Sequence, residues 1–192
     1  MLQRGTLIIV TGVPGTGKTT ISMMLAERLG GRYIDLGKIA LEEGLVSGRD
    51  PYRDTKVADL TALRKRVAAL SGRGDALVID GHYSPSVVAR GRASLVVVLR
   101  RAPWVLRDEL RARGYPPGKV RENLEAELLG VCLADALSEQ DPSKVCELDT
   151  TGVNPEETVK EIAAILSGEA TCRRGTVDWM EAPEAEEMLR SI

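Results

Sequence analysis

The sequence is poor in several residue types, and each shortage excludes a class of protein. Its three cysteines, Cys132, Cys146 and Cys172, are odd in number, widely spaced and without a Cys-x-x-Cys pair. This pattern argues against a disulfide framework or a zinc site and favours a reducing compartment. No apolar run approaches the length of a membrane span, and the run near the N-terminus is too short for a signal peptide. We therefore expect a cytoplasmic protein with no membrane partner.

An excess of charge of either sign is also missing. Lys and Arg number 26 and Asp and Glu number 28, so the formal net charge is -2. A generally basic surface is excluded, and with it general nucleic-acid binding; any anionic partner must be held by local arrangements of Arg and Lys. With 192 residues, 43% of them hydrophobic, the chain is long enough to bury one substantial core.

Short apolar runs alternate along the chain with stretches of helical periodicity, which is typical of an α/β layer fold. We expect strands at residues 6–11, 33–35, 76–80, 94–99 and 145–148. Beyond the helix that follows the first strand, we expect helices at residues 54–70, 103–112, 120–138 and 155–166. The core is expected over residues 1–168, followed by a tail, residues 169–192. In that tail Trp179 would anchor the chain to the core, and a short amphipathic helix would carry Ala185, Met188, Leu189 and Ile192.

Residues 12–19 match the pattern G-x-x-x-x-G-K-[ST] and lie where this motif belongs, between a buried strand and a helix. Triphosphate oxygens must approach backbone N–H groups closely, so Gly12, Gly15 and Gly17 remove side chains and permit positive φ. The start of the next helix adds unpaired N–H donors and a positive dipole end. A Gly-rich turn would match by chance in about one chain in a hundred of this length. The motif predicts an ATP-binding loop.

Three side chains around this loop have roles that the chemistry of phosphoryl transfer predicts. Lys18 would bridge the β and γ phosphates, and the Thr19 hydroxyl would ligate Mg²⁺. Asp80 ends an apolar strand, as a Walker B carboxylate does, and would hold Mg²⁺ directly or through water. The alternative for Asp80 is a strand-ending residue that caps the next turn. Asp75 precedes the strand and would emerge at the opposite edge of the sheet.

Two further features have competing interpretations. His82 is the single histidine, and a lone histidine is usually structural, but it follows the carboxyl end of a strand, where α/β folds bind ligands. A phosphate acceptor is already ionised, so His82 would matter most for orienting water in an ATPase. The Arg-rich segment 111–121 encloses Gly-Tyr-Pro-Pro-Gly. It is either a basic loop that closes over phosphates or a solvated helix end.

With these residues in place, the sequence resembles the adenylate kinase isoenzyme six family of eukaryotes and archaea. The resemblance covers about residues 6–166 and rests on GVPGTGKTT from residue 12, YIDLG at 33–37, VIDGH at 78–82 and, most diagnostically, VVVLRRAPWVLRDELRARGYPPGKVRENLEAEL at 96–128. It implies an adenylate-kinase-like P-loop NTPase fold, three-layer α/β/α with a five-stranded parallel sheet. It also implies a nucleoside-monophosphate (NMP) binding segment at about 35–57 and a lid at about 112–122.

The resemblance assigns roles to residues of this chain. ATP would be held by Gly12, Gly15, Thr16, Gly17, Lys18, Thr19, Thr20 and Arg113. Catalysis would use Lys18, Asp80, His82 and Arg113, with Thr19 and Asp80 as the magnesium ligands. The implied activities are phosphorylation of AMP and other NMPs by ATP, and ATP hydrolysis. The implied biological role is small-subunit ribosome maturation and rRNA processing, through binding the S-eleven family ribosomal protein of the pre-ribosomal particle.

Two positions depart from the family pattern. Leu41 stands before Glu42 and Glu43, where family members often carry Arg, so recognition of the acceptor phosphate would fall to Arg49 or Arg53. Gly81 stands where an aromatic residue is frequent beside the histidine. Two other functions stay open at this point. One is an assembly-factor ATPase with incidental kinase activity. The other is a kinase of another hydroxylated metabolite, with Asp35 as its base, which the 96–128 stretch disfavours.

Overall fold

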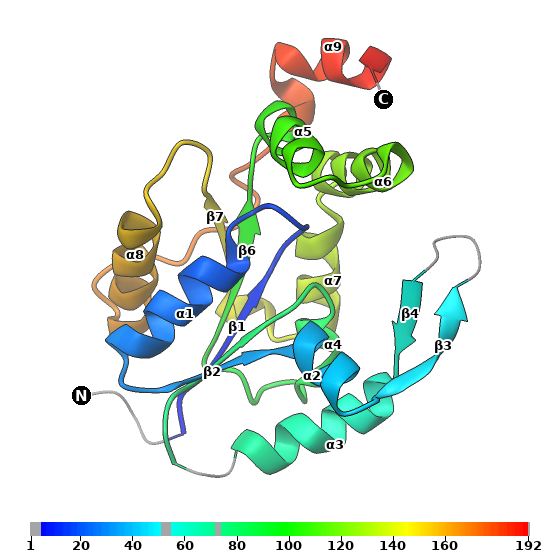
Figure 1. The fold of residues 1–192 in the computed structure, drawn as a ribbon. Coiled ribbons are helices and arrows are strands. Elements are labelled where there is room, and N and C mark those ends of the chain that lie inside the picture. Colours follow the sequence, from blue (N-terminus) through cyan, green and yellow to red (C-terminus); the bar gives the residue numbers. More distant parts are fainter. Residues whose placement is uncertain (1–4, 51–54, 72–73, 192) are drawn as a thin grey trace.

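A five-stranded parallel sheet lies at the centre of the protein (Figure 1). The computed structural model describes residues 5–50, 55–71 and 74–191. The sheet comprises β1 (Leu7–Thr11), β2 (Arg32–Asp35), β5 (Leu77–Asp80), β6 (Leu95–Arg100) and β7 (Val145–Asp149), in the order β2-β5-β1-β6-β7. Every neighbouring pair is parallel. The predicted fold class, a three-layer α/β/α arrangement around five parallel strands, is confirmed, and all five expected strands form within a residue or two of their expected bounds.

The strands are apolar on both faces because each face is covered by helices. Ile8 and Val10 of β1 face a layer that contains α1 (Lys18–Arg28) and α8 (Pro155–Ser167). Leu7 and Ile9 face the opposite layer, which contains α2 (Leu36–Glu42), α3 (Leu60–Ser71), α4 (Ser84–Val87) and α7 (Val131–Glu139). Figure 1 shows α1 and α8 side by side on one flank of the sheet and α4 and α7 on the other.

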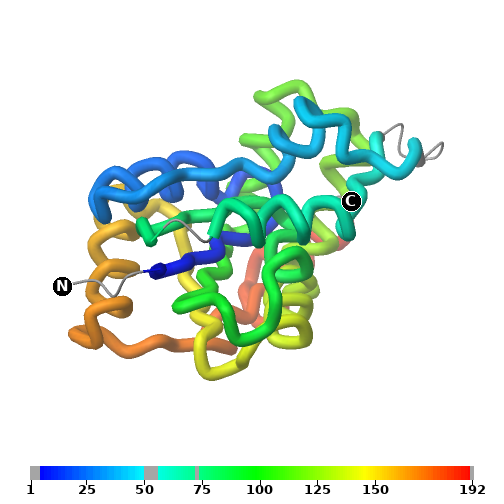
Figure 2. The backbone as a smooth tube through the Cα atoms, turned by 90° about the horizontal axis from the view of Figure 1, so that it is seen from below, coloured from blue at the N-terminus to red at the C-terminus, as the bar shows by residue number. Residues whose placement is uncertain are grey.

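The expected helix at 54–70 is wrong in its first part. Residues 55–58 form β4 (Thr55–Ala58), which pairs antiparallel with β3 (Val46–Asp50), and α3 starts only at Leu60. Asp59 sets the start of α3, because its carboxylate accepts a hydrogen bond from the Ala62 amide at 2.9 Å. Figures 1 and 2 place the β3–β4 hairpin at the far side of the molecule from α8.

The single helix expected at 120–138 is two helices, α6 (Pro117–Leu128) and α7. Gly130 separates them in a left-handed conformation, with φ of 63°, which a continuous helix cannot contain. The helix predicted at 103–112 forms as α5 (Pro103–Ala112), with Pro103 in its first turn. Together α5 and α6 make a helical hairpin, hereafter the lid hairpin, that lies beyond the carboxyl ends of the strands (Figure 1).

The chain after α8 packs back onto the core. After Gly168 it turns along β7, where the Glu147 amide donates to the Arg173 carbonyl at 2.7 Å. This return brings Cys172 to Cys146, and the two form a disulfide. The expectation that no cysteines pair is therefore wrong. The two residues are 26 positions apart, and only the return of the chain along the edge strand brings them together.

The rest of the tail forms a short 3₁₀ helix, η2 (Trp179–Glu181), and α9 (Glu184–Ser191). Trp179 is buried, which confirms its expected role as an anchor. Ala185 and Met188 of α9 are also buried, whereas Leu189 is 47% exposed, so the apolar face of α9 is narrower than expected. Ile192 lies outside the described residues.

A further 3₁₀ turn, η1 (Pro142–Lys144), precedes β7. Among the described helices, none combines the length and the apolar character needed to cross a membrane.

Candidate active site

The loop between β1 and α1 requires glycine at its three motif positions. Gly12, Gly15 and Gly17 have φ of 142°, 95° and 88°, all in the region that the motif predicts. A Cβ on Gly12 would lie 2.5 Å from the Leu99 carbonyl oxygen, and one on Gly15 would lie 2.5 Å from a methyl of Leu106. The loop therefore packs directly against β6 and α5, without room for side chains.

Thr16 stabilises this loop through a hydrogen bond inside it. Its side chain is fully buried, and its hydroxyl donates to the Val13 carbonyl at 3.0 Å. The side chain therefore stabilises the conformation of the loop. Thr19 and Thr20 are exposed in the first turn of α1. First-turn amides lack intrahelical acceptors, so α1 presents N–H donors and its positive dipole end at the mouth of the loop.

Lys18 lies across the loop, where its ammonium donates to the Val13 carbonyl oxygen at 2.9 Å. Burial lowers the pKa of Lys18, and the positive charge of Arg113 acts in the same direction. The negative charge of Asp80 acts in the opposite direction. Lys18 is therefore a buried cation whose pKa responds to charges on both sides of the loop.

Asp80 is the last residue of β5 and is 3% exposed. It stands opposite Val10 of β1, which places it beside the loop, and its Oδ2 accepts a hydrogen bond from the Tyr33 hydroxyl at 3.2 Å. Burial raises the pKa of Asp80, while hydrogen bonding to Thr19 and the charge of Lys18 lower it. Asp75, at the other end of the strand, is exposed and lies 3.7 Å from Arg32 Nε.

The donor chemistry around Asp80 fits magnesium. Asp80 and Thr19 supply a carboxylate and a hydroxyl oxygen, and Mg²⁺ is usually held by one or two protein oxygens together with substrate phosphates and water. In the ranges that the structure describes, no group of three or more His, Cys, Asp and Glu residues is arranged for a metal. A metal here would therefore be held jointly by these two side chains and a bound triphosphate.

His82 follows the carboxyl end of β5 by two residues and is an exposed residue. Its backbone carbonyl accepts a hydrogen bond from the Thr11 hydroxyl at 3.3 Å. Desolvation by surrounding protein atoms lowers the pKa of His82, and the charge of Lys18 acts in the same direction. The imidazole is therefore neutral at pH 7, in the form that can accept a proton or a hydrogen bond.

Arg113 caps the end of α5 at the tip of the lid hairpin and is exposed. Gly114 follows with φ of 75°, and the Tyr115 amide donates back to the Leu110 carbonyl at 3.1 Å, which turns the chain into α6. The segment predicted as a lid, 112–122, is thus a tight turn followed by the first part of α6.

The segment predicted to bind the acceptor comprises α2, the β3–β4 hairpin and the start of α3. The Asp35 carboxylate caps α2 by accepting from the Lys38 amide at 3.0 Å. Glu43 forms an ion pair with Arg66 of α3 at 2.8 Å, whereas Leu41 is 58% exposed. Of the two arginines predicted on this side, Arg49 lies in β3 and Arg53 lies outside the described residues.

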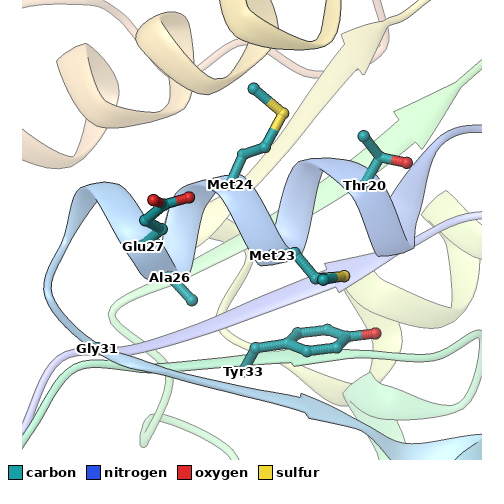
Figure 3. Close-up of a pocket in the computed structure, with 7 residues that line it drawn as sticks. All are labelled: Thr20, Met23, Met24, Ala26, Glu27, Gly31 and Tyr33. Atoms are coloured by element: carbon teal, nitrogen blue, oxygen red, sulfur yellow. The ribbon is translucent and has the colours of Figure 1, made fainter.

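Tyr33 is a site residue that the sequence did not predict. Its hydroxyl holds Asp80, and its ring lines a groove of about 640 Å³ with Thr20, Met23, Met24, Ala26, Glu27 and Gly31. Figure 3 shows the ring lying along α1 with its hydroxyl directed toward the end of the helix where Thr20 stands. Tyr33 belongs to the strand predicted at 33–35. The pairing of this strand with β5, in which Asp35 stands opposite Asp80, brings the Tyr33 hydroxyl to the Asp80 carboxylate.

Known proteins share this architecture and resemble this chain in sequence. Residues 8–130 match the family described as an AAA domain. A protein of Thermococcus gammatolerans named "Putative adenylate kinase" is 42% identical over 91% of this chain and 93% of its own length. A protein of the same name from Methanothermobacter thermautotrophicus is 43% identical over 90% and 96%. The chain belongs to this archaeal adenylate-kinase-like family.

Structural comparison places this adenylate-kinase-like chain among the P-loop kinases in fold. Shikimate kinase from Acinetobacter baumannii, solved with shikimate, superposes with a TM-score of 0.61. The match covers 89% of this chain and 97% of the kinase, at 19% identity, which shows a shared fold.

Proposed function

We propose that this protein is a nucleoside monophosphate kinase that transfers the γ-phosphoryl group of ATP to AMP or another NMP. One observation carries the proposal: a glycine-lined loop leads into α1, with the Lys18 ammonium hydrogen-bonded inside it and the buried carboxylate Asp80 on the neighbouring strand. This site lies at the carboxyl edge of a parallel sheet, where α/β folds bind ligands. The named relatives support the same activity class.

The chemistry requires positioning and charge stabilisation rather than a covalent intermediate. Loop amides and Lys18 would hold the triphosphate, and Arg113 would approach from the lid hairpin. An oxygen of the acceptor phosphate attacks the γ-phosphorus as the bond to the ADP oxygen breaks. Magnesium, held with Asp80 and Thr19, would neutralise charge on the phosphates. The acceptor is already ionised at neutral pH, so the transfer needs no general base.

A coupled assay of ATP consumption with and without each NMP tests the proposal. We expect consumption that depends on an NMP and yields the nucleoside diphosphate. A metabolite kinase is the rival assignment, and it would require a base such as Asp35. The Asp35 carboxylate already caps α2, which supports the nucleotide assignment. ATP consumption that no NMP stimulates would contradict the proposal.

His82 supports a second candidate function, ATP hydrolysis. His82 is exposed and follows the carboxyl end of β5 by two residues, where it would orient a water molecule toward the γ-phosphate. For His82→Ala we expect hydrolysis without acceptor to fall by about 10²-fold, while NMP phosphorylation stays within about twofold of wild type. Phosphate release and NDP formation measured on the same samples check this result. An equal loss of both activities would instead make His82 part of the kinase machinery.

On the strength of the family resemblance alone, we also propose a role in small-subunit ribosome maturation. The partner would be the S-eleven family ribosomal protein. Binding between the two purified proteins, measured by calorimetry with and without ATP, tests this role independently of the kinase assay. Absence of binding under both conditions would exclude the partner.

A further inference from the structure

The C-terminal segment 169–191, hereafter the strap, is attached to the core at three successive places. It begins at the Cys146–Cys172 disulfide on β7. It then binds Glu147, whose Oε2 accepts from the Thr176 amide at 2.9 Å and the Val177 amide at 3.3 Å. It ends on the lid hairpin, where α9 packs against α5. Figure 1 shows it rising past β7 to lie beyond α5.

Trp179 is the point at which the strap holds both helices of the lid hairpin. Its ring packs edge to face on Trp104 in the first turn of α5, with centroids 5.7 Å apart. Its indole N–H donates to Glu127 Oε1, near the end of α6, at 2.8 Å. One side chain therefore ties the first turn of α5 to the last turn of α6, at the root of the hairpin whose tip carries Arg113.

Glu127 is itself fixed to the sheet. The same Oε1 accepts from Arg100 Nε at 2.7 Å and from the Arg101 amide at 3.2 Å, both at the end of β6. Arg100 also binds Glu147 of β7, and its guanidinium lies 6.0 Å from the centre of the Trp179 ring. Arg100, Glu127 and Glu147 are all at most 2% exposed. In such surroundings a hydrogen bond is strong and its loss is costly.

A displacement at the hairpin root would reach the nucleotide site, because α5 packs on the phosphate-binding loop. Leu106 of α5 occupies the space where a Gly15 side chain would be. Leu106 and Leu110 are fully buried, so α5 cannot shift without disturbing this contact. Arg113 is the residue that ends α5, so a displacement of this helix would also move Arg113.

We propose that Trp179 is a positioning residue for phosphoryl transfer: the strap holds the root of the lid hairpin and so sets where Arg113 stands relative to the loop. This inference rests on the proposed kinase function. According to this inference, the strap affects ATP binding and transfer but not acceptor binding. The acceptor segment, with α2 and the β3–β4 hairpin, lies at the opposite edge of the sheet from β7, so acceptor binding is independent of the strap.

The test is Trp179→Phe in the full-length protein, which keeps an aromatic ring and removes the N–H donor to Glu127. We expect the KM for ATP to rise about tenfold and kcat to fall several-fold, because a small misplacement of a charged group is costly in transfer. The KM for the NMP should stay within about twofold. A general loss of stability would not separate the two substrates in this way.

Val159→Ala is the matched control. Val159 is 4% exposed and packs in the other core layer, on α8, so its truncation lowers stability while the contacts of Trp179 with Trp104 and Glu127 stay in place. We expect a reduced melting temperature with all three kinetic parameters within about twofold of wild type. Unchanged ATP parameters in Trp179→Phe, or an equal rise in both KM values, would overturn the inference.

Calorimetric ATP affinity, measured without acceptor, separates this inference from the proposed function. If the wild-type protein phosphorylates no NMP, the proposed function fails, but a tenfold weaker ATP affinity of Trp179→Phe still supports the strap as a positioning device. If the wild-type protein is an active kinase and the variant binds ATP as wild type does, the inference fails alone. In the variant, Trp104 is the single tryptophan, so its fluorescence also reports whether the α5 root has moved.

Discussion

Replacement of Lys18 by Ala should lower kcat/KM for phosphoryl transfer by about 10³-fold or more. Lys18 is the first residue of α1, and its ammonium bonds to Val13 within the loop that would hold the triphosphate. It would stabilise charge that develops on the migrating group, and an uncharged methyl cannot. Folding should change little, because the native state loses one hydrogen bond to Val13, worth about 1 kcal/mol. Initial rates with saturating ATP and NMP measure the effect.

Lys160→Ala is the control for this substitution. Lys160 is exposed on α8, in the layer away from the acceptor segment, so the same change of charge occurs outside the site. Its rates should equal those of the wild type. Turnover near the wild-type level in Lys18→Ala would refute the assignment of the loop as the catalytic phosphate site.

Replacement of Arg100 by Met should destabilise the fold by about 3–5 kcal/mol. The guanidinium is the shared partner of Glu127 and Glu147, and the side chains of these two glutamates are 1% and 0% exposed. Without it, two carboxylates are left close together in the interior with no cation between them. Denaturant unfolding at pH 7, followed by circular dichroism, measures the loss.

The pH dependence of this loss provides a second check. Burial already raises the pKa of Glu127 in the wild type, despite the opposing charge of Arg100. When the pKa of a carboxyl group is higher in the folded state than in the unfolded state, its protonated form stabilises the fold. This stabilisation is complete below the unfolded-state pKa, about 4.3, and is lost as the pH rises through the folded-state pKa. Removing Arg100 raises that pKa further. The variant should therefore be closer to wild type at pH 5 than at pH 8.

Arg101→Met is the control for the buried cluster. Arg101 follows Arg100 in the chain and pairs with Glu109 at a partly exposed position. Pairs of this kind contribute about 0–1 kcal/mol. A similar loss in both variants would show that Arg100 is not special, and that the cluster contributes no more than a surface ion pair.

Where local chemistry decides a structure, the sequence predicts this protein well. The helix at 103–112 has Pro103 in its first turn and an apolar stripe that ends in Leu106 and Leu110, and it forms with the predicted bounds. The phosphate-binding loop follows from three glycines whose backbone conformation few other residues adopt. In both cases the determining interactions lie within one or two turns of chain.

The features that the sequence did not predict depend on contacts between distant segments. Residues 55–58 look like the start of a helix, and only their pairing with 46–50 makes them a strand. Arg100, Glu127 and Glu147 look like ordinary surface charges, because nothing local shows that three elements meet around them. Tyr33 was missed for the same reason, since its partner Asp80 is 47 residues away.

The Cys146–Cys172 bond closes a covalent ring that contains the whole of α8. A cross-link between residues 26 apart lowers the entropy of the unfolded chain by an amount equivalent to about 3.5 kcal/mol. If α8 detaches from the sheet while this bond is intact, the helix cannot diffuse away, and it re-docks from a high effective concentration. The strap therefore stays attached to β7 through the disulfide even while α8 is transiently detached from the sheet.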